Sequence, residues 1–327
     1  AEDGIRDIHC SLVGSEMCIR DRINPVLLVA SLMVASTPIL LAAMGELVAE
    51  RSGVLNLGVE GMMIVGAVSG FIIAVETGSP ALGFVAAAIG ATLLSLIFAV
   101  LTQIFLSNQV ATGLGLTLFG LGVSALMGQE YAQLRTPNSP RLEFFGLNEL
   151  PVLGPILFNQ HLVVYLSLAL VAGVWWYLRS TRSGLILRAV GESHEAAHAL
   201  GYSVVGTRFA AIAFGGACAG LGGAFLSLVI VPQWTDGMTA GRGWIALAIV
   251  VFASWRSWRV LIGAYLFGGV TVLQLNLQAA GIAIPVELLS MSPYLITIVV
   301  LVIISSERGR ATQSAPGSLG RSFHASA

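Results

Sequence analysis

The chain has 327 residues, of which 56% are hydrophobic and only 10% are charged, and its mean hydropathy is +0.87. Soluble domains carry about 25% charged residues, so this composition excludes an ordinary soluble fold and indicates a membrane protein. The net charge of -1 leaves no basic surface for nucleic acid. All sixteen basic residues are arginine, so the chain lacks the lysine of a Walker A phosphate loop. If ATP drives this protein, another chain must bind it.

Residues 1–22 differ from the rest of the chain. They hold eight of its 33 Asp, Glu and Arg residues and two of its three cysteines. They contain no continuous apolar core of the kind that a signal peptide needs. The text at 10–22, CSLVGSEMCIRDR, is similar to a translated sequencing adapter. We therefore expect residues 1–22 to be a non-native leader, with the true start missing or near Ile23.

Long apolar stretches follow, each near the ~20 residues with which a helix crosses a bilayer. The most evident lie at 26–44, 81–106, 161–178, 209–231 and 259–275. Shorter stretches lie between them. The sequence predicts an all-α polytopic membrane protein with about 8–10 transmembrane helices, at least one of them broken or re-entrant. Small residues at 216–224, GACAGLGGA, favour close helix packing, although glycine is common in membrane helices generally.

The run at 45–63 reads GELVAERSGVLNLGVEGMM and places polar residues between two apolar spans. A charged side chain at the centre of a lipid-facing helix costs roughly 2.5–3.5 kcal/mol, so these groups must face protein, water or the membrane boundary. Glu46 and Glu50 have two open interpretations. Either they line a polar path, or Glu50 and the next arginine form a solvated pair at a cytoplasmic turn, with Glu46 and Glu60 snorkelling nearby. Asn56 and Glu60 are four residues apart, which on a helix is one face. They are the first candidates for lining the path or holding a helix break.

Arginine placement predicts which ends of the helices face the cytoplasm, because cytoplasmic loops carry an excess of basic residues. Four arginines fall in the loop 179–208, two mark a turn at 256–259 and two follow at 308–310. Counting crossings back from these positions puts the loop 129–160 outside and the C-terminus inside.

One crossing in this count is too short. Between an outer loop at 231–240 and the next cytoplasmic turn, the apolar run 244–255 has only twelve residues, about 18 Å as a helix against a ~30 Å bilayer core. It predicts a broken or re-entrant crossing of the kind that lines substrate paths in transporters. Trp234, Asp236 and Arg242 at its outer mouth are further path candidates, although interfacial Trp also serves for anchoring alone.

Three stretches, in the same order, resemble one family. The run 45–63 is similar to a signature of permease subunits of bacterial ABC importers, in the nucleoside and simple-sugar branch of the branched-chain amino acid/ribose-type permease family. The stretch 241–248, GRGWIALA, resembles the GRGFIALA block of that family, and 184–201 resembles its cytoplasmic coupling loop. The resemblance covers roughly residues 30–305, and three ordered motifs are not expected by chance.

The resemblance implies a permease domain at 23–306 with a cytoplasmic coupling loop at 179–208, followed by a disordered cytoplasmic tail at 307–327. It implies the membrane-spanning subunit of an ATP-driven, binding-protein-dependent importer for nucleosides or, alternatively, simple sugars. The chain itself would then be no enzyme and would hold no cofactor, since ATP and Mg would bind the partner ATPase subunit. The other implied partners are a second permease subunit, in a homo- or heterodimer, an extracytoplasmic substrate-binding lipoprotein and a small-molecule substrate. The implied location is the bilayer of a bacterial plasma (inner) membrane.

Within the coupling loop, the resemblance assigns a short helix that fits a cleft of the ATPase subunit. Small residues would form its contacting face, and Gly201 would stop the helix. The residues assigned to this contact are Gly191, Glu192, Glu195, Ala196, Ala197 and Gly201.

The run 194–198 reads HEAAH and therefore also matches HExxH, the helix turn with which zinc proteases hold their metal. A catalytic zinc needs a third protein ligand, and the downstream candidates lie outside or in the tail, so we expect no metal. An intramembrane zinc protease and an ion-coupled secondary transporter are the alternatives from other classes. The transporter would need a coupling acid deep in a span, whereas the glutamates here lie near predicted span ends.

Overall fold

The computed structural model describes residues 25–137, 139, 141–143, 158–279, 291, 295, 298 and 315–324. The helices of this part are, in order, α2 (Pro25–Arg51), α3 (Val59–Thr77), α4 (Pro80–Ala99), α5 (Gln109–Gly128), α6 (Leu162–Ser180), α7 (Arg182–Glu192), α8 (His194–Ala199), α9 (Val204–Phe225), α10 (Arg242–Phe252) and α11 (Ser257–Ala279). Shorter elements are the π-helices η1 (Val100–Ile104) and η4 (Leu226–Ile230), the 3-10 turn η2 (Gln129–Tyr131), and the antiparallel strands β1 (Arg141–Glu143) and β2 (Asn159–His161).

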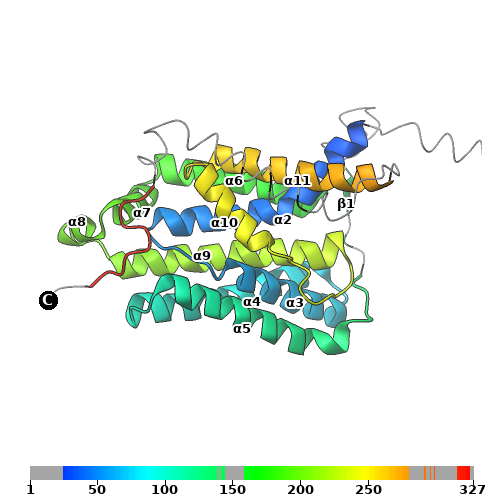
Figure 1. Ribbon diagram of the computed structural model, residues 1–327, viewed down its shortest axis with the longest axis horizontal. Coiled ribbons are helices and arrows are strands. Elements are labelled where there is room, and N and C mark those ends of the chain that lie inside the picture. Colours follow the sequence, from blue (N-terminus) through cyan, green and yellow to red (C-terminus); the bar gives the residue numbers. More distant parts are fainter. Residues whose placement is uncertain are drawn as a thin grey trace, which may run out of the picture.

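The long helices run side by side along the longest axis of the molecule (Figure 1). Helix α5 lies along one side, α6 and α11 lie along the opposite side, and α9 and α2 lie between them (Figure 1). Seven described helices are long and apolar enough to cross a membrane. These findings confirm an all-α polytopic membrane protein. The predicted leader 1–22 lies outside the described residues. The stretch before Arg308, which the predicted topology needs as a last crossing, also lies outside them, apart from residues 291, 295 and 298.

Helix α9 forms the centre of the bundle because its small residues let neighbouring backbones approach. Gly216 lies against Ala91 and Ser95 of α4, and a side-chain carbon at Gly223 would collide with the backbone oxygen of Met63 on α3. Most of α9 is buried, including the glycines of this face. The small-residue run of the sequence is therefore a packing face.

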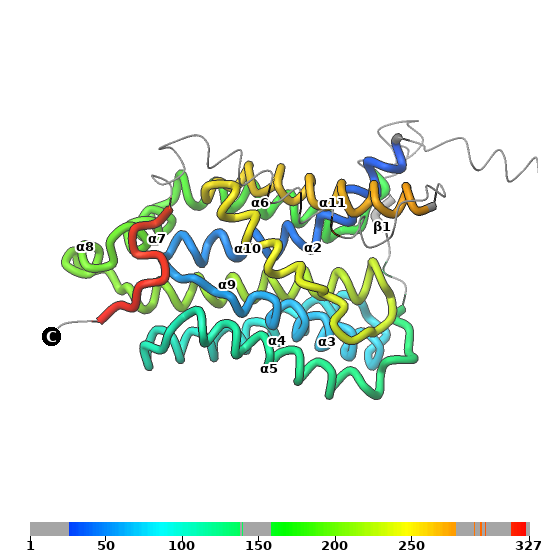
Figure 2. The backbone as a smooth tube through the Cα atoms, in the orientation of Figure 1, coloured from blue at the N-terminus to red at the C-terminus, as the bar shows by residue number. Residues whose placement is uncertain are grey.

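Two segments interrupt the helices inside the bundle. Residues 52–58 leave the end of α2 and run back into the bundle before α3 begins (Figure 2). Residues 231–241 follow η4 and return toward the middle of the bundle, where α10 begins (Figure 2). Helix α10 has 11 residues and spans about 16 Å, roughly half of a bilayer core. The predicted broken crossing is therefore confirmed.

Asn56 and Glu60 do not share a helical face, contrary to the prediction from their spacing. Helix α3 begins only at Val59, so Asn56 lies in the irregular segment 52–58. The side-chain oxygen of Asn56 accepts a hydrogen bond from the backbone nitrogen of Gly58 at 3.0 Å. Such a local bond gives the backbone an alternative to a helix, which is why the spacing rule fails here.

Arginines from three of the turns that were predicted to face inward lie together at one end of the bundle. One cavity of about 330 Å³ is lined by Arg51, Arg179, Arg188 and Arg256. At the predicted outer side, Arg135 pairs with Gln233 in an isolated bridge between the loop after α5 and the segment 231–241. This separation agrees with the predicted topology, because loops that are predicted to lie on the same side of the membrane meet although they are far apart in the sequence.

Residues 315–324 are packed against helices, whereas the sequence predicted disorder throughout 307–327. Ser318 and Phe323 are buried, and Phe323 packs in one cluster with Val190, Ala197 and Val204. The single aromatic ring finds an apolar site on the coupling loop, which local composition does not reveal.

The topology predicts a clear labelling result in a chain whose Cys10 and Cys18 are replaced. We expect Asp236→Cys to react with a membrane-impermeant maleimide added outside intact cells, because the segment 231–241 is predicted to be extracytoplasmic. Ser193→Cys should react only after the cells are opened, because the coupling loop is predicted to be cytoplasmic. Both positions are exposed, and Cys218 is buried and supplies no background. The reverse pattern would overturn the topology.

Candidate functional site

Side chains from three helices, α2, α5 and α9, satisfy the irregular backbone of the segment 52–58. Buried backbone groups without partners are costly inside a membrane protein, so irregular backbone at this depth needs such support. The hydrogen bonds run from Leu55 N to Gln109 Oε1 (2.8 Å), from Asn56 N to Glu46 Oε1 (3.3 Å), from Thr117 Oγ1 to Leu57 O (3.1 Å) and from Arg208 Nε to Ser52 O (3.3 Å). The polar residues around the signature run therefore hold a break in the helices.

Glu46 and Glu50 lie one turn apart on α2, and both carboxylates are buried. Oε2 of Glu50 accepts a hydrogen bond from the indole nitrogen of Trp255. Oε2 of Glu46 and Oε1 of Glu50 have no hydrogen-bond partner within the described ranges. The interpretation of Glu50 as part of a solvated cluster at a cytoplasmic turn is wrong, because its carboxylate lies inside the bundle against an aromatic ring.

Glu60 holds the beginning of α10. Its Oε1 accepts hydrogen bonds from Thr239 Oγ1 at 2.6 Å and from Gly241 N at 2.9 Å, and its Oε2 accepts one from Gly243 N at 2.7 Å. Glu60 itself lies in the first turn of α3 and is only 4% exposed. Two helix N-termini, each with a partial positive charge, thus meet at one carboxylate. This arrangement stabilises a buried anion and fixes where α10 starts.

The opposite end of α10 is attached to the same part of the chain. Arg51 donates two hydrogen bonds to the carbonyl oxygen of Trp255, from Nε at 3.1 Å and from Nη2 at 2.8 Å. The Trp255 indole also donates to Glu50. We call residues 46–60 the anchor segment, because they hold α10 at both ends. The two family-like sequence blocks, nearly 200 residues apart, are thus one structural unit.

The backbone on both sides of α10 is strained. Ala240 before the helix has φ 47°, and Ser254 and Trp255 after it have φ 50° and 55°. Non-glycine residues in this left-handed region cost of order 1–3 kcal/mol each and persist only where the surroundings fix them. The contacts to the anchor segment supply that fixation.

The remaining predicted path residues do not gather at this site. Trp234 is buried against Phe71, with ring centroids 6.3 Å apart. Asp236 is exposed in the segment 231–241. Arg242 donates to Met238 O at 3.0 Å and lines a separate cavity of about 570 Å³, together with polar residues of β2. The predicted set therefore divides into a buried anchor and scattered outer residues.

The predicted coupling loop folds as two short helices, α7 and α8. The Thr181 and Ser193 side chains cap them by accepting hydrogen bonds from Gly184 N and Ala196 N. Glu192, Glu195 and Ala196 are exposed, so they are accessible to a partner. Gly201 has φ 84° and its nitrogen donates to His198 O, which confirms it as the stop of the helix.

Ala197 and Gly191 have roles inside the chain, contrary to their assignment to a partner contact. Ala197 is 2% exposed and faces Phe323 and Val190. Gly191 is buried, and a side chain there would collide with the backbone oxygen of Arg51. On a helix of one turn and a half, neighbouring alanines point in different directions, so only one of the pair can face a partner.

The two histidines of the HExxH match serve the packing of the loop. His194 and His198 both meet Phe323 edge to face, with ring centroids 5.4 Å and 5.2 Å apart. Arg208 Nη2 lies 3.3 Å from His194 Nδ1, so the neutral ring accepts there and carries its proton on Nε2. Within the described ranges, no three potential ligands gather as a metal site. The expectation that the chain binds no metal stays a prediction.

We expect acidification to loosen the contact between residues 315–324 and α8. Burial, followed by the charge of Arg208, lowers the pKa of His194 below its ordinary value of 6.5; Arg321 adds to this effect and Glu195 opposes it. The unfolded loop therefore binds a proton more readily, so the stability of the contact is complete above pH 6.5 and falls as the pH drops toward the lowered pKa. Protection of 315–324 against hydrogen exchange, relative to the intrinsic exchange rate at each pH, should fall between neutral pH and about pH 5.

The control for this prediction is the second histidine. The exchange should lose its pH dependence in His194→Gln and keep it in His198→Gln. Equal protection at both pH values in the parent chain would contradict the role of His194.

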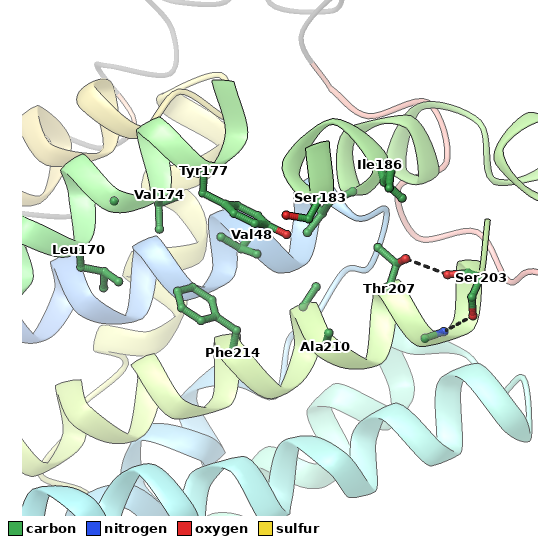
Figure 3. Close-up of a pocket in the computed structure, with 14 residues that line it drawn as sticks. Val48, Leu170, Val174, Tyr177, Ser183, Ile186, Ser203, Thr207, Ala210 and Phe214 are labelled. Atoms are coloured by element: carbon green, nitrogen blue, oxygen red, sulfur yellow. Dashed lines mark hydrogen bonds between the residues drawn. The ribbon is translucent and has the colours of Figure 1, made fainter. Parts of the chain in front are cut away.

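A cavity of about 640 Å³ lies beside the coupling loop, between α6, α7 and α9 (Figure 3). Its wall is mostly apolar, with Tyr177 and Phe214 on facing helices, and hydroxyl groups of Ser183 and Thr207 lie near its end beside α7 (Figure 3). No residue of the predicted path set lines it. Val48 of α2 is the one residue of the anchor segment among those that line this cavity.

Several residues of this region escaped the sequence analysis. Thr239 and Trp255 carry the two attachments of α10, and Arg208 is fully buried rather than a loop charge. Ser318 and Phe323 belong to a stretch that was expected to be disordered. Among these residues, only Trp255 could have been found from the sequence, because it is an aromatic residue that lies beside a basic residue in a turn.

Comparison with known proteins assigns this architecture. The family described as "Branched-chain amino acid transport system / permease component" matches residues 28–304. The chain belongs to this permease family. The match includes α2, α3 and α10, so the anchored helix lies within the family domain. No solved structure gives a significant match to this chain.

Three curated relatives cover most of this permease. It is 40% identical over 289 residues (82% of this chain and 88% of the relative) to TsgC13 of Haloferax volcanii, provisionally named a glucose ABC transporter permease protein. It is 31% identical to the nucleoside ABC transporter permease protein NupC of Lactococcus lactis and 32% identical to the guanosine ABC transporter permease protein NupQ of Bacillus subtilis. The last two alignments each cover 84% of this chain and 91% of the relative.

Proposed function

We propose that this permease carries nucleosides inward across a bacterial plasma membrane, driven by a separate ATPase subunit. The family match over 28–304 carries the proposal, because it includes the anchor segment and α10 and thus the whole candidate site. Two relatives that align over 91% of their length are named for nucleoside and guanosine transport. Their names support the substrate class.

The proposed assembly has two permease subunits, two ATPase subunits and an extracytoplasmic substrate-binding lipoprotein. ATP and Mg bind the ATPase subunits, so this chain contributes no catalytic group. Exposed Glu195, Ala196 and Leu200 form the candidate ATPase contact on α8, where the leucine is 75% exposed. Large exposed apolar side chains beside charged residues are typical of a surface that meets another protein. This end of the bundle, with residues 315–324, is cytoplasmic in the proposal.

The path in this proposal runs along α10 and the segment 231–241. Buried Glu46, Glu50 and Glu60 accept hydrogen bonds from the segments around the helix breaks. These bonds, with the local turn at Asn56, support a role in holding the helix breaks rather than in touching substrate. Broken helices held at mid-depth by polar groups are a common way to build a transport site. On the proposed outer side, Asp236 is exposed and Arg242 is half-buried, where it lines the cavity beside β2.

A simple sugar is the second candidate substrate. The 40% identity to a protein named for glucose supports it. The anchor segment does not separate the two classes, because its polar groups are engaged inside the bundle. Substrate choice must therefore come from other residues or from the lipoprotein that delivers the substrate.

Competition in reconstituted uptake decides between the two substrates. We expect uptake of labelled guanosine in vesicles that hold this permease, its ATPase and its binding lipoprotein. An excess of unlabelled adenosine should reduce that uptake, and an excess of glucose should not. Glucose uptake that nucleosides leave unchanged would assign the chain to sugar import.

A further inference from the structure

The segment 315–324 joins parts of the chain that lie far apart in sequence. Ser318 N donates to Gly191 O at 2.9 Å, and Ser318 Oγ accepts from His194 N at 3.1 Å. Gly320 N donates to Gly53 O at 3.1 Å, at the beginning of the irregular segment 52–58. Figure 2 shows this segment in red beside α7 and α8, at the end of the bundle where α2 stops. One short stretch thus contacts both the coupling loop and the anchor region.

The side chain of Phe323 forms the apolar surface against which α8 packs. Its ring is 7% exposed and packs against Ala197, Val190 and Val204, and it meets both histidines of α8 edge to face. Helix α8 has only six residues. Helices shorter than about 12 residues are marginal in water without tertiary contacts. The orientation of α8 therefore depends on its packing against Phe323.

Arg208 connects the same place to the core of the bundle. Its buried guanidinium donates to Ser52 O at 3.3 Å, to Gln103 Oε1 at 3.3 Å and to Arg321 O at 3.1 Å. The same group faces His194 Nδ1. The segment 315–324, the helix α8, the end of α2 and the π-helix η1 therefore all meet at one cation in the first turns of α9.

We propose that residues 315–324 form a brace that positions α8 for energy coupling, with Ser318 and Phe323 as its positioning residues. This inference rests on the proposed function, since α8 is the candidate ATPase contact. The exposed face of α8 meets the ATPase subunit, while the brace holds its buried face against Arg208 and the end of α2. Movement of α8 is then transmitted to the anchor segment and to α10, instead of being lost in a loose loop.

The test is the amount of substrate imported per ATP hydrolysed in reconstituted vesicles. We expect this ratio to fall by about fivefold or more in Phe323→Ala and in a chain that ends after residue 314. A change of this size is typical when the coupling between two sites is lost. The apparent KM for substrate should stay unchanged, because the outer side of the permease is intact. Phe323→Tyr should restore the ratio, and the matched control His324→Ala, at an exposed neighbour, should match the parent.

An unchanged ratio in Phe323→Ala would overturn the brace. Failure of the parent complex to import with ATP would instead overturn the proposed function, so the two failures are distinguishable. A second measurement avoids variants that fail to fold: a disulfide between Ala197→Cys and Phe323→Cys, in a chain whose Cys10 and Cys18 are replaced. The brace predicts coupled import while the pair is oxidised, because the disulfide then replaces the contact of the ring, and a ratio as low as that of Phe323→Ala after reduction. Import that returns only on reduction would show that the segment must leave α8 and would contradict the proposal.

Discussion

Glu60→Leu should reduce substrate uptake by about tenfold or more while the permease still inserts in the membrane. The leucine removes the acceptor for Thr239 Oγ1, Gly241 N and Gly243 N. Each buried donor left without an acceptor costs about 1–3 kcal/mol, and the negative charge at two helix N-termini is lost as well. Helix α10 then has no fixed starting point. Initial uptake rates in reconstituted vesicles, divided by the amount of inserted protein, measure the effect.

The matched control lies on the same helix. Glu76→Leu removes a carboxylate near the other end of α3, where Tyr131 OH donates to it at 2.8 Å on the exposed surface. Exposed polar contacts contribute little, so this variant should transport like the parent. Glu60→Gln keeps one acceptor oxygen and should fall between the two. Parental uptake in Glu60→Leu would show that the carboxylate does not position α10 for transport.

Gly223→Val should prevent the bundle from packing. A side chain at this position of α9 meets the backbone oxygen of Met63 and the backbone nitrogen of Ala67 on α3. Backbone atoms cannot move aside as a flexible side chain can, so overpacking costs about 1–3 kcal/mol or more. We expect a large loss of monodisperse protein in detergent and a lower melting temperature. Fluorescence-detected size exclusion with a thermal challenge measures both.

Gly115→Val on α5 is the control for bulk in a membrane helix. Among the residues that the structure describes, no other helix or side chain comes within 4 Å of a Cβ atom placed at Gly115. The two variants add the same methyl groups, so their difference isolates the helix contact. Similar losses in both would mean that the valine acts through helix propensity alone.

The fold class and the broken crossing could be predicted because both depend on counts along the chain. The apolar run ending at Trp255 is too short to cross a bilayer whatever surrounds it. The distribution of arginines along the chain predicted which loops lie together at each end of the bundle. The small residues of α9 gave a packing face, since glycine leaves a surface that another backbone can approach.

The contacts at the site could not be predicted because they join distant residues. Glu60 binds groups about 180 positions away, and the spacing of the signature run carries no information about them. Asn56 was misassigned because its side chain turns the backbone locally, which a helical spacing rule ignores. The contact between Ala197 and Phe323 depends on the three-dimensional packing of a loop that is too short to fold alone, so it could not be predicted from the sequence.

The most direct test of the account is whether import depends on ATP hydrolysis by a partner chain. Vesicles should hold this permease, the binding lipoprotein, and either the active ATPase or a form that binds but cannot hydrolyse ATP. The account predicts uptake with the active ATPase and ATP, none with the inactive form, and no change when proton and sodium gradients are collapsed. Uptake that follows an ion gradient and ignores ATP would contradict it and assign the chain to the ion-coupled transporters.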